Sequence, residues 1–171
     1  ILFASATFVA SVVIGVQGQR ATEHAAATAS ERIGLVQAMQ VAQLRMVSAI
    51  RSAGLQTDGG QLNKDVEDYR TALKALTTAE STFSGLSVGD DERALLGQSA
   101  ALRQQAEPVV DEAIRFTMAF AGDEAAKLLS EKFAPIERQW AEVLGKLATV
   151  QREQADAAKT AIAESNRQRL T

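Results

Sequence analysis

The sequence contains no cysteine and one histidine, and each scarcity removes a class of chemistry. Without cysteine there is no disulfide framework, no thiol nucleophile and no Cys-based zinc site. His24 follows Glu23, but the chain has no Glu-x-x-His pair of the kind that di-iron bundles use. A glycine-rich phosphate-binding loop is also missing. We therefore expect no catalytic residue, no metal and no cofactor, and predict that the protein is not an enzyme.

Proline and aromatic residues are also scarce, with two prolines and 5% aromatics. Alanine, leucine, glutamine, glutamate and arginine, which favour helices, are abundant, and β-branched residues are sparse after the first sixteen positions. The net charge of −3 gives no reason to expect nucleic acid as a partner. The length of 171 residues suits one domain, and the composition predicts an all-α fold.

Charge is absent from the beginning of the chain. The segment "ILFASATFVASVVIGVQGQ" (1–19) precedes the first charged residue, Arg20. Its apolar part is shorter than the roughly 20 residues that span a bilayer, so a signal-peptide core or a buried helix are alternatives. However, no clean cleavage pattern follows, and the chain starts without Met or a basic flank. We interpret residues 1–19 as the partial end of a first transmembrane helix of a longer parent protein.

Apolar residues recur in steps of three and four along four segments, which is typical of helices that bury one face in a bundle. The four stripes are Leu35, Met39, Ala42, Met46, Ala49 and Ala53; Leu62, Val66, Tyr69, Leu73, Leu76 and Phe83; Leu95, Leu102, Ala106, Val109, Ala113, Phe116 and Phe120; and Leu129, Phe133, Ile136, Trp140, Val143, Leu147, Val150, Ala157 and Ala161. A weaker stripe of Val36, Val47 and Ile50 suits a reversible homodimer contact.

Turn-forming residues separate the stripes. "TDGG" (57–60) and "SGLSVGDDE" (84–92) predict the first two breaks, and the three acidic residues of the second suit the N-terminus of a helix. In "AGDE" (121–124), Gly122 is the expected helix stop and Asp123 the next cap. Pro108 and Pro135 fall inside helices, where each is expected to kink or loosen the helix.

These boundaries predict helices at about 20–56, 62–86, 91–121 and 124–168. The first and last are the longest, so they are expected to continue beyond the shorter middle pair. The predicted fold is an antiparallel up-down-up-down four-helix bundle whose helices 1 and 4 extend toward a membrane. Residues 20–171 would then form one four-helix-bundle domain beside that membrane.

At this level the sequence resembles the periplasmic four-helix-bundle sensor domain of methyl-accepting chemotaxis proteins. The similarity rests on "LRMVSAIRSAGLQTD" (44–58), "NKDVEDYRTALKAL" (63–76), "DERALLGQSAALRQQAEPVVDEAI" (91–114) and "AGDEAAKLLSEKFAPIERQWAEVLGKLATVQ" (121–151). The resemblance covers about residues 20–165 and implies a homodimer in the inner membrane with transmembrane helices on both sides. It also implies a small-molecule ligand bound far from the membrane and a signal carried by displacement of helix 4.

In the aspartate- and serine-sensing members of that family, arginines near the distal end of helix 1 bind the ligand carboxylates. Here the residues around Arg51 match those around the second of the three family arginines. Arg45 corresponds to the first but lies one residue out of register, and Leu55 stands where the third would be. Neither arginine has Asp or Glu three or four residues away, which favours an anion as partner over a local ion pair.

Helix 4 is expected to provide the opposing wall. Its candidates are Ser130, Phe133 and the carbonyl of Glu131, which Pro135 leaves without its helical donor. Phe133 also fits the core stripe, and core packing is the better interpretation of it. The missing third arginine argues against an amino-acid dicarboxylate and leaves an organic acid open. The ligand expected overall is an organic acid or an amino acid.

The sequence thus favours the ligand-sensing domain of a bacterial chemoreceptor. Two alternatives remain open. One is a membrane-tethered structural or protein-interaction bundle, and the other is the input domain of a sensor histidine kinase.

Overall fold

The computed structural model describes the backbone of residues 4–168 and the side chains of residues 26–164 and of Arg167. This part of the chain is helical, and the predicted all-α class is confirmed. The elements are α1 (Ala4–Gly54), α2 (Gly59–Ser84), α3 (Asp90–Met118), α4 (Gly122–Leu128), the π-helix η1 (Leu129–Phe133) and α5 (Ala134–Gln168). The expected fourth helix is therefore three consecutive helical elements.

The chain divides into two compact units. One consists of Ile1–Ile33 and Gln151–Thr171, and the other of Gly34–Val150. We call the second unit the bundle. Its four helical segments are α1 from Gly34 onward, α2, α3, and the run from α4 through η1 into α5 up to Val150.

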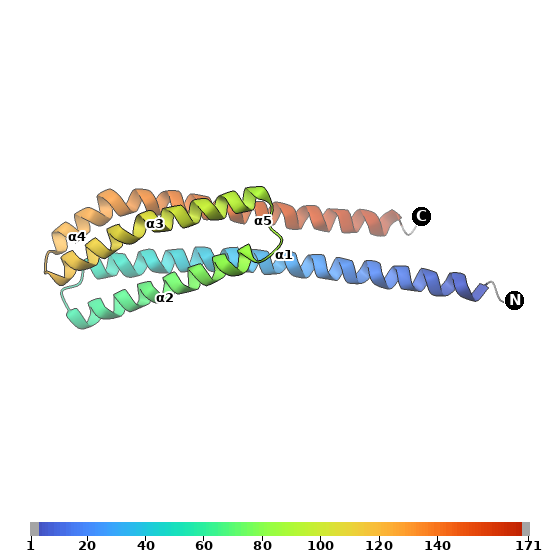
Figure 1. Cartoon of the computed structure of the whole chain (residues 1–171), viewed down its shortest axis with the longest axis horizontal. Coiled ribbons are helices and arrows are strands. Elements are labelled where there is room, and N and C mark those ends of the chain that lie inside the picture. Colours follow the sequence, from blue (N-terminus) through green and yellow to red (C-terminus); the bar gives the residue numbers. More distant parts are fainter. Residues whose placement is uncertain (1–3, 169–171) are drawn as a thin grey trace. The chain divides into compact units, whose positions relative to one another are not determined.

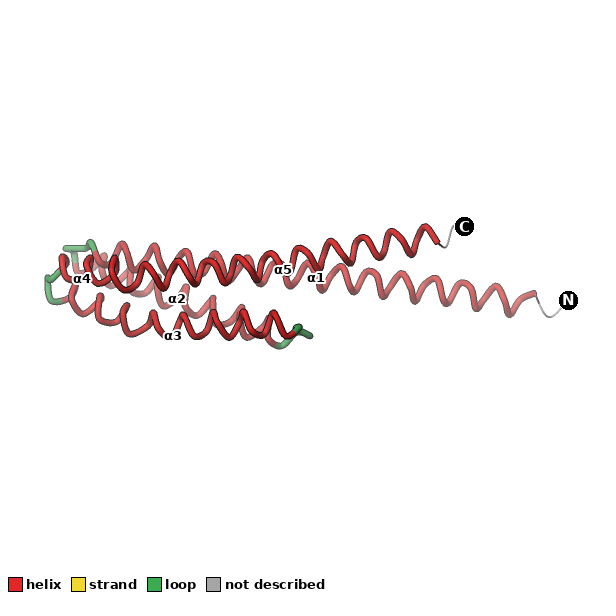
Figure 2. Tube along the Cα trace, turned by 90° about the horizontal axis from the view of Figure 1, so that it is seen from above, coloured by secondary structure: helices red, strands yellow, loops and turns green. Residues whose placement is uncertain are grey.

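In the bundle, consecutive helical segments lie side by side and alternate in direction (Figure 1). The short connections α1–α2 and α3–α4 lie at one end, and the α2–α3 connection lies at the other, as Figure 2 shows. We call the end with two connections the apical end. This arrangement is the antiparallel four-helix bundle that the sequence predicts.

The bundle core follows the predicted stripes closely. Met39, Met46, Leu76, Phe83 and Trp140 are almost completely buried. Burial of such side chains contributes about 1.5–3 kcal/mol each, so this seam is the main source of the bundle's stability.

Three predicted core positions are wrong. Phe120 is 90% exposed, and Ala157 and Ala161 are exposed as well. In α5 the buried face passes through Gln151 and Ala155 instead. A stripe defined by apolar residues alone misses this face because Gln151 is polar.

The predicted dimer stripe is also wrong. Val36, Val47 and Ile50 are at most 5% exposed within one chain, because they lie in the bundle core beside the first stripe. They have no surface left for a second copy.

The helix ends have identifiable caps. Asp58 Oδ1 accepts a hydrogen bond from Gln61 N at 2.9 Å at the start of α2. Glu92 Oε2 accepts from Gly89 N at 2.5 Å, and three acidic residues occupy the first turn of α3, as predicted. Both arrangements place a negative charge on unpaired backbone N–H groups at a helix N-terminus.

The end of α3 differs from the expectation. Ala121 N donates to Phe116 O at 2.9 Å, and Phe120 N donates to Thr117 O at 3.0 Å. These two bonds define a Schellman motif, whose left-handed position glycine usually occupies. Here Phe120 occupies it with φ 60°, while Gly122 is the first residue of α4 and Asp123 lies in its first turn.

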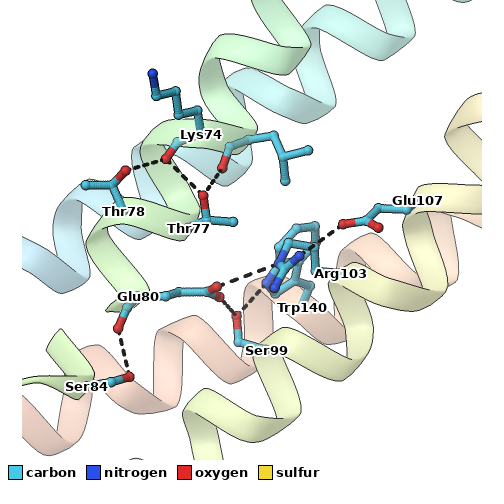
Figure 3. A network of polar contacts seen from close by, with 10 residues as sticks. Lys74, Thr77, Thr78, Glu80, Ser84, Ser99, Arg103, Glu107 and Trp140 are labelled. Carbon is cyan, nitrogen blue, oxygen red and sulfur yellow. Dashed lines mark hydrogen bonds and ion pairs between the residues drawn. The ribbon is translucent and has the colours of Figure 1, made fainter. Parts of the chain in front are cut away.

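A polar network connects three helices inside the bundle (Figure 3). Trp140 Nε1 of α5 donates to Ser99 Oγ of α3 at 2.9 Å, and that hydroxyl donates to Glu80 Oε1 of α2 at 2.8 Å. Arg103 completes it with Nε 3.7 Å from Glu80 Oε2 and Nη1 3.0 Å from Glu107 Oε1. Because Trp140 and Ser99 at its centre are buried and hydrogen-bonded to each other, the network favours one alignment of the helices.

The other unit contains the remaining parts of α1 and α5. Arg32 Nη1 donates to Gln154 Oε1 at 3.4 Å, and Gln151 and Ala155 are buried. The predicted membrane segment 1–19 lies outside the residues whose side chains the structure describes.

One stretch of the described side chains, Ala26–Gly54, is long and apolar enough to be considered as a membrane span. Its large apolar residues, such as Met39 and Met46, form the bundle core. Core packing therefore accounts for its apolar character.

Candidate functional site

Arg51 lies in the last turn of α1, at the apical end of the bundle. Its Nη2 is 2.5 Å from Glu137 Oε2 in the first turn of α5. The Arg51 side chain is 57% exposed, and that of Glu137 is 17% exposed. Arg51 thus has a carboxylate partner 86 residues away, which a search for neighbours three or four positions away does not find.

Arg45 lies on the wall of a different feature, a groove of about 510 Å³ between α1 and α2. The lining residues are Ala38, Val41, Ala42, Arg45, Ser48, Ala49, Ser52, Asp65, Asp68, Thr71, Ala72 and Ala75. Small side chains leave this space open, and Arg45, Asp65 and Asp68 give it charges of both signs. Arg51 is not among the lining residues, so the two candidate arginines do not share this groove.

Asp65 is a buried carboxylate at the apical end of the groove. It accepts hydrogen bonds from Ser52 Oγ at 2.7 Å, Gln56 Nε2 at 3.3 Å and Gln61 Nε2 at 3.1 Å. These donors come from the end of α1, the following turn and the start of α2. Asp65 therefore ties the two helices together around their connection, and its oxygens are already occupied.

Ser130, Glu131 and Phe133 all lie in η1. Ser130 is exposed and donates from Oγ to Lys127 O at 2.9 Å, and Glu131 is exposed. Phe133 is 2% exposed and belongs to the bundle core, as its stripe position indicates. A solute can therefore reach the first two residues of this predicted wall but not the phenyl ring.

Pro135 explains why a π-helix forms here. It has no N–H to donate to Glu131 O, so the i→i−4 pattern cannot continue through this turn. Instead, Ala134 N donates to Leu129 O, five residues back. The predicted loosening of the helix at Pro135 is this π segment, whereas α3 continues unbroken through Pro108. Single-turn π segments are frequent at functional sites.

The end of α1 lies very close to η1. A Cβ atom on Gly54 would lie 2.8 Å from Leu129 Cδ1, and a Cβ on Gly122 would lie 3.9 Å from Gly54 O. Glycine at position 54 therefore leaves room for the Leu129 side chain against the end of α1. Together with the Arg51–Glu137 ion pair, this contact brings the Arg51 region and the π segment into one apical cluster.

Sequence reasoning missed Glu137 and the two aspartates of the groove. Glu137 is the residue after Ile136, which belongs to the predicted stripe of the last helix. Only the alignment of that helix along the first helix would have placed Glu137 near Arg51. Asp65 and Asp68 lie one turn apart in α2 and read as solvated charges. No feature of the sequence gives the pairing between distant helices.

No protein-family model matches this chain, and no curated protein matches it. Among the described side chains, no group of three or more histidine or acidic residues is arranged to hold a metal ion. The apical cluster and the exposed surface of α1 are therefore the candidate functional features of the chain.

Proposed function

We propose that this chain is the ligand-sensing domain of a bacterial transmembrane chemoreceptor. It would bind a small solute, a carboxylate such as an organic acid or an amino acid, and signal by displacement of the last helix. The support is the antiparallel bundle, the resemblance of its sequence to chemotaxis sensor domains, and an arginine at the apical end of α1. In this proposal the bundle lies in the periplasm, and the apolar segment 1–19 anchors it in the inner membrane.

The observation that carries the proposal is an unpartnered face of α1. Val41 and Leu44 are 47% and 62% exposed, and Leu55, directly after the end of α1, is 78% exposed. At 100° per residue, Val41 and Leu44 share an arc of roughly 120° with the exposed residues Arg45 and Arg51. An apolar stripe with two arginines beside it suits a contact with a second copy, in which ligand-binding arginines stand next to the seam.

This face replaces Val36, Val47 and Ile50 as the proposed homodimer surface. Its alternating apolar and polar residues suit a reversible contact. In a two-fold dimer each copy contributes the same face, so Arg45 and Arg51 of both copies would line the seam.

Two measurements on the full chain in mild detergent test the proposal. Sedimentation should reveal a dimer that Leu44→Glu weakens by roughly tenfold or more, because the substitution places a charge in an apolar contact. Met118→Glu is the matched control, since Met118 is 54% exposed but lies on α3.

Calorimetry against organic acids and amino acids is the second measurement. Arg51→Glu should abolish binding of an acidic solute, since it reverses the charge that the carboxylate meets. Binding that survives Arg51→Glu would show that the site is elsewhere. Silence across the whole panel would contradict direct sensing.

The ion pair of Arg51 with Glu137 favours the rival class, a membrane-tethered structural bundle, because the arginine already has a partner. The coding sequence after Thr171 separates the alternatives. A second transmembrane segment followed by a HAMP-like linker and a long helical hairpin supports a chemoreceptor, and a kinase core there supports a sensor histidine kinase.

A further inference from the structure

The Arg51–Glu137 ion pair is asymmetric in its exposure to solvent. The guanidinium is 57% exposed, so a solute can reach it, whereas the carboxylate is 17% exposed. Glu137 therefore presents a carboxylate to Arg51 from the protein side and pairs with one nitrogen of the guanidinium. Any acidic solute meets an arginine whose Nη2 already has an anionic partner at 2.5 Å.

Displacement of Glu137 has an electrostatic cost. A carboxylate that is mostly removed from water and loses its cationic partner is strongly destabilised. A solute with only negative groups would create this state where it takes Nη2 from Glu137, and on the other guanidinium nitrogens it would still place a second anion beside Glu137. A solute that carries a cation next to its carboxylate would avoid it, because its ammonium group can pair with Glu137 while its carboxylate pairs with Arg51.

We propose that Glu137 is the specificity-determining residue of the Arg51 site and that it selects zwitterions over plain carboxylic acids. The proposal rests on the sensing function above and names the ligand class of that site. Arg51 and Glu137 together carry no net charge, so the pair is complementary to a molecule with one positive and one negative group. Plain monoacids and diacids are then poor ligands because Glu137 competes with them.

The position of Glu137 also connects ligand choice to the last helix. The residue lies in the first turn of α5, just after Pro135 and the π segment Leu129–Phe133. A ligand ammonium that takes over Glu137 weakens a direct tie between α1 and α5 where the helical hydrogen bonding is already interrupted. Trp140 follows three residues later, and its indole is buried and bonded to Ser99. As the only tryptophan in the chain, it reports such a change by fluorescence.

The test compares matched solutes that differ in an amino group. Three pairs are titrated into the full chain in mild detergent: propionate and alanine, succinate and aspartate, and butyrate and 4-aminobutyrate. Calorimetry gives the dissociation constants, and Trp140 emission is recorded in parallel. In the wild-type protein, at least one amino compound should bind tenfold or more tightly than its partner acid.

Glu137→Gln should remove this preference, since the neutral amide no longer competes for Arg51 or attracts an ammonium group. Plain acids should then bind as well as their amino partners or better, including acids that the wild type does not bind. Glu137→Asp keeps the charge on a shorter side chain and should retain the sign of the preference. Glu142→Gln is the matched control, because it also removes a carboxylate from an exposed ion pair on α5, 2.8 Å from Lys146 Nζ, and should leave the preference unchanged.

The outcomes separate the two proposals. Binding with the same amino preference in wild type and Glu137→Gln overturns the role of Glu137 and leaves solute sensing intact. Failure of every compound to bind either protein overturns both. Circular dichroism of each variant shows whether a loss of binding reflects a loss of fold.

Discussion

The indole nitrogen of Trp140 lies 2.9 Å from the hydroxyl oxygen of Ser99, and both residues are at most 1% exposed. Trp140 belongs to α5 and Ser99 to α3, so the bond joins two helices through the middle of the bundle. The same hydroxyl donates to Glu80 on α2. One small polar side chain thus pairs with a buried donor and with a half-buried acceptor.

Ser99→Ala should destabilise the bundle by about 1–3 kcal/mol, because it leaves the buried Trp140 N–H and a half-buried Glu80 oxygen without their partner. Urea unfolding followed by Trp140 fluorescence and by circular dichroism measures the change. Ser84→Ala is the control, since this exposed hydroxyl only donates to the Glu80 backbone oxygen. Its effect should stay within about 0.5 kcal/mol.

Gly54→Ala should destabilise the apical end by about 1–3 kcal/mol, since the new methyl group would lie 2.8 Å from Leu129 Cδ1 in a packed site. Thermal or urea unfolding measures it. Gly97→Ala should instead stabilise the protein by about 0.5–1 kcal/mol, because a Cβ there meets no atom within 4 Å and alanine favours a helix.

A double-mutant cycle sharpens this prediction. Leu129→Ala alone should destabilise by about 2–5 kcal/mol through the cavity that it creates. Combined with Gly54→Ala, the loss should be smaller than the sum of the two, because the shorter side chain makes room for the methyl group. Strict additivity would show that the contact does not limit the packing.

Phe120→Gly should stabilise the protein by up to about 1 kcal/mol, since the left-handed conformation strains a residue with a Cβ but not glycine. Little burial is lost, because the phenyl ring is 90% exposed. Phe120→Ala keeps the Cβ and therefore the strain, and it should change the unfolding free energy by less than about 0.5 kcal/mol. A Phe120→Gly protein less stable than Phe120→Ala would contradict the explanation.

The raised pKa of the Tyr69 phenol predicts that the protein loses stability in alkali. Burial, and then the negative charges of Glu107 and Asp111, raise the pKa of its phenol from 10.0 to about 12, although Arg103 acts in the opposite direction. The folded state therefore holds this proton more tightly than the unfolded state, so its contribution is complete below pH 10 and is lost as the pH rises toward 12. The loss amounts to roughly 2–3 kcal/mol.

Two measurements check the Tyr69 prediction. Because Tyr69 is the only tyrosine, the ultraviolet absorbance of tyrosinate in the folded protein should rise with a midpoint near pH 12. The unfolding free energy of Tyr69→Phe should fall less steeply between pH 10 and 12 than that of the wild type. Equal slopes would mean that other groups cause the alkaline loss.

Local sequence determined the helices and their order. The stripe residues Met39, Leu76 and Trp140 are buried, and Asp58 and Glu92 cap helices near the predicted breaks. Such features depend on neighbours within one or two turns, and periodicity and capping chemistry describe those neighbours completely. The effect of Pro135 was visible for the same reason, because a missing N–H acts on the preceding turn of its own helix.

Tertiary structure alone decided which faces are paired and which are free. It buried Val36, Val47 and Ile50, exposed Phe120, and paired Arg51 with Glu137 across 86 positions. The rotation of each helix about its axis depends on side chains of three other helices. The periodicity within one helix does not indicate which side chains these are. For the same reason, the sequence marked Arg51 as a candidate ligand contact, while only the packing of α1 against α5 revealed the carboxylate that pairs with it.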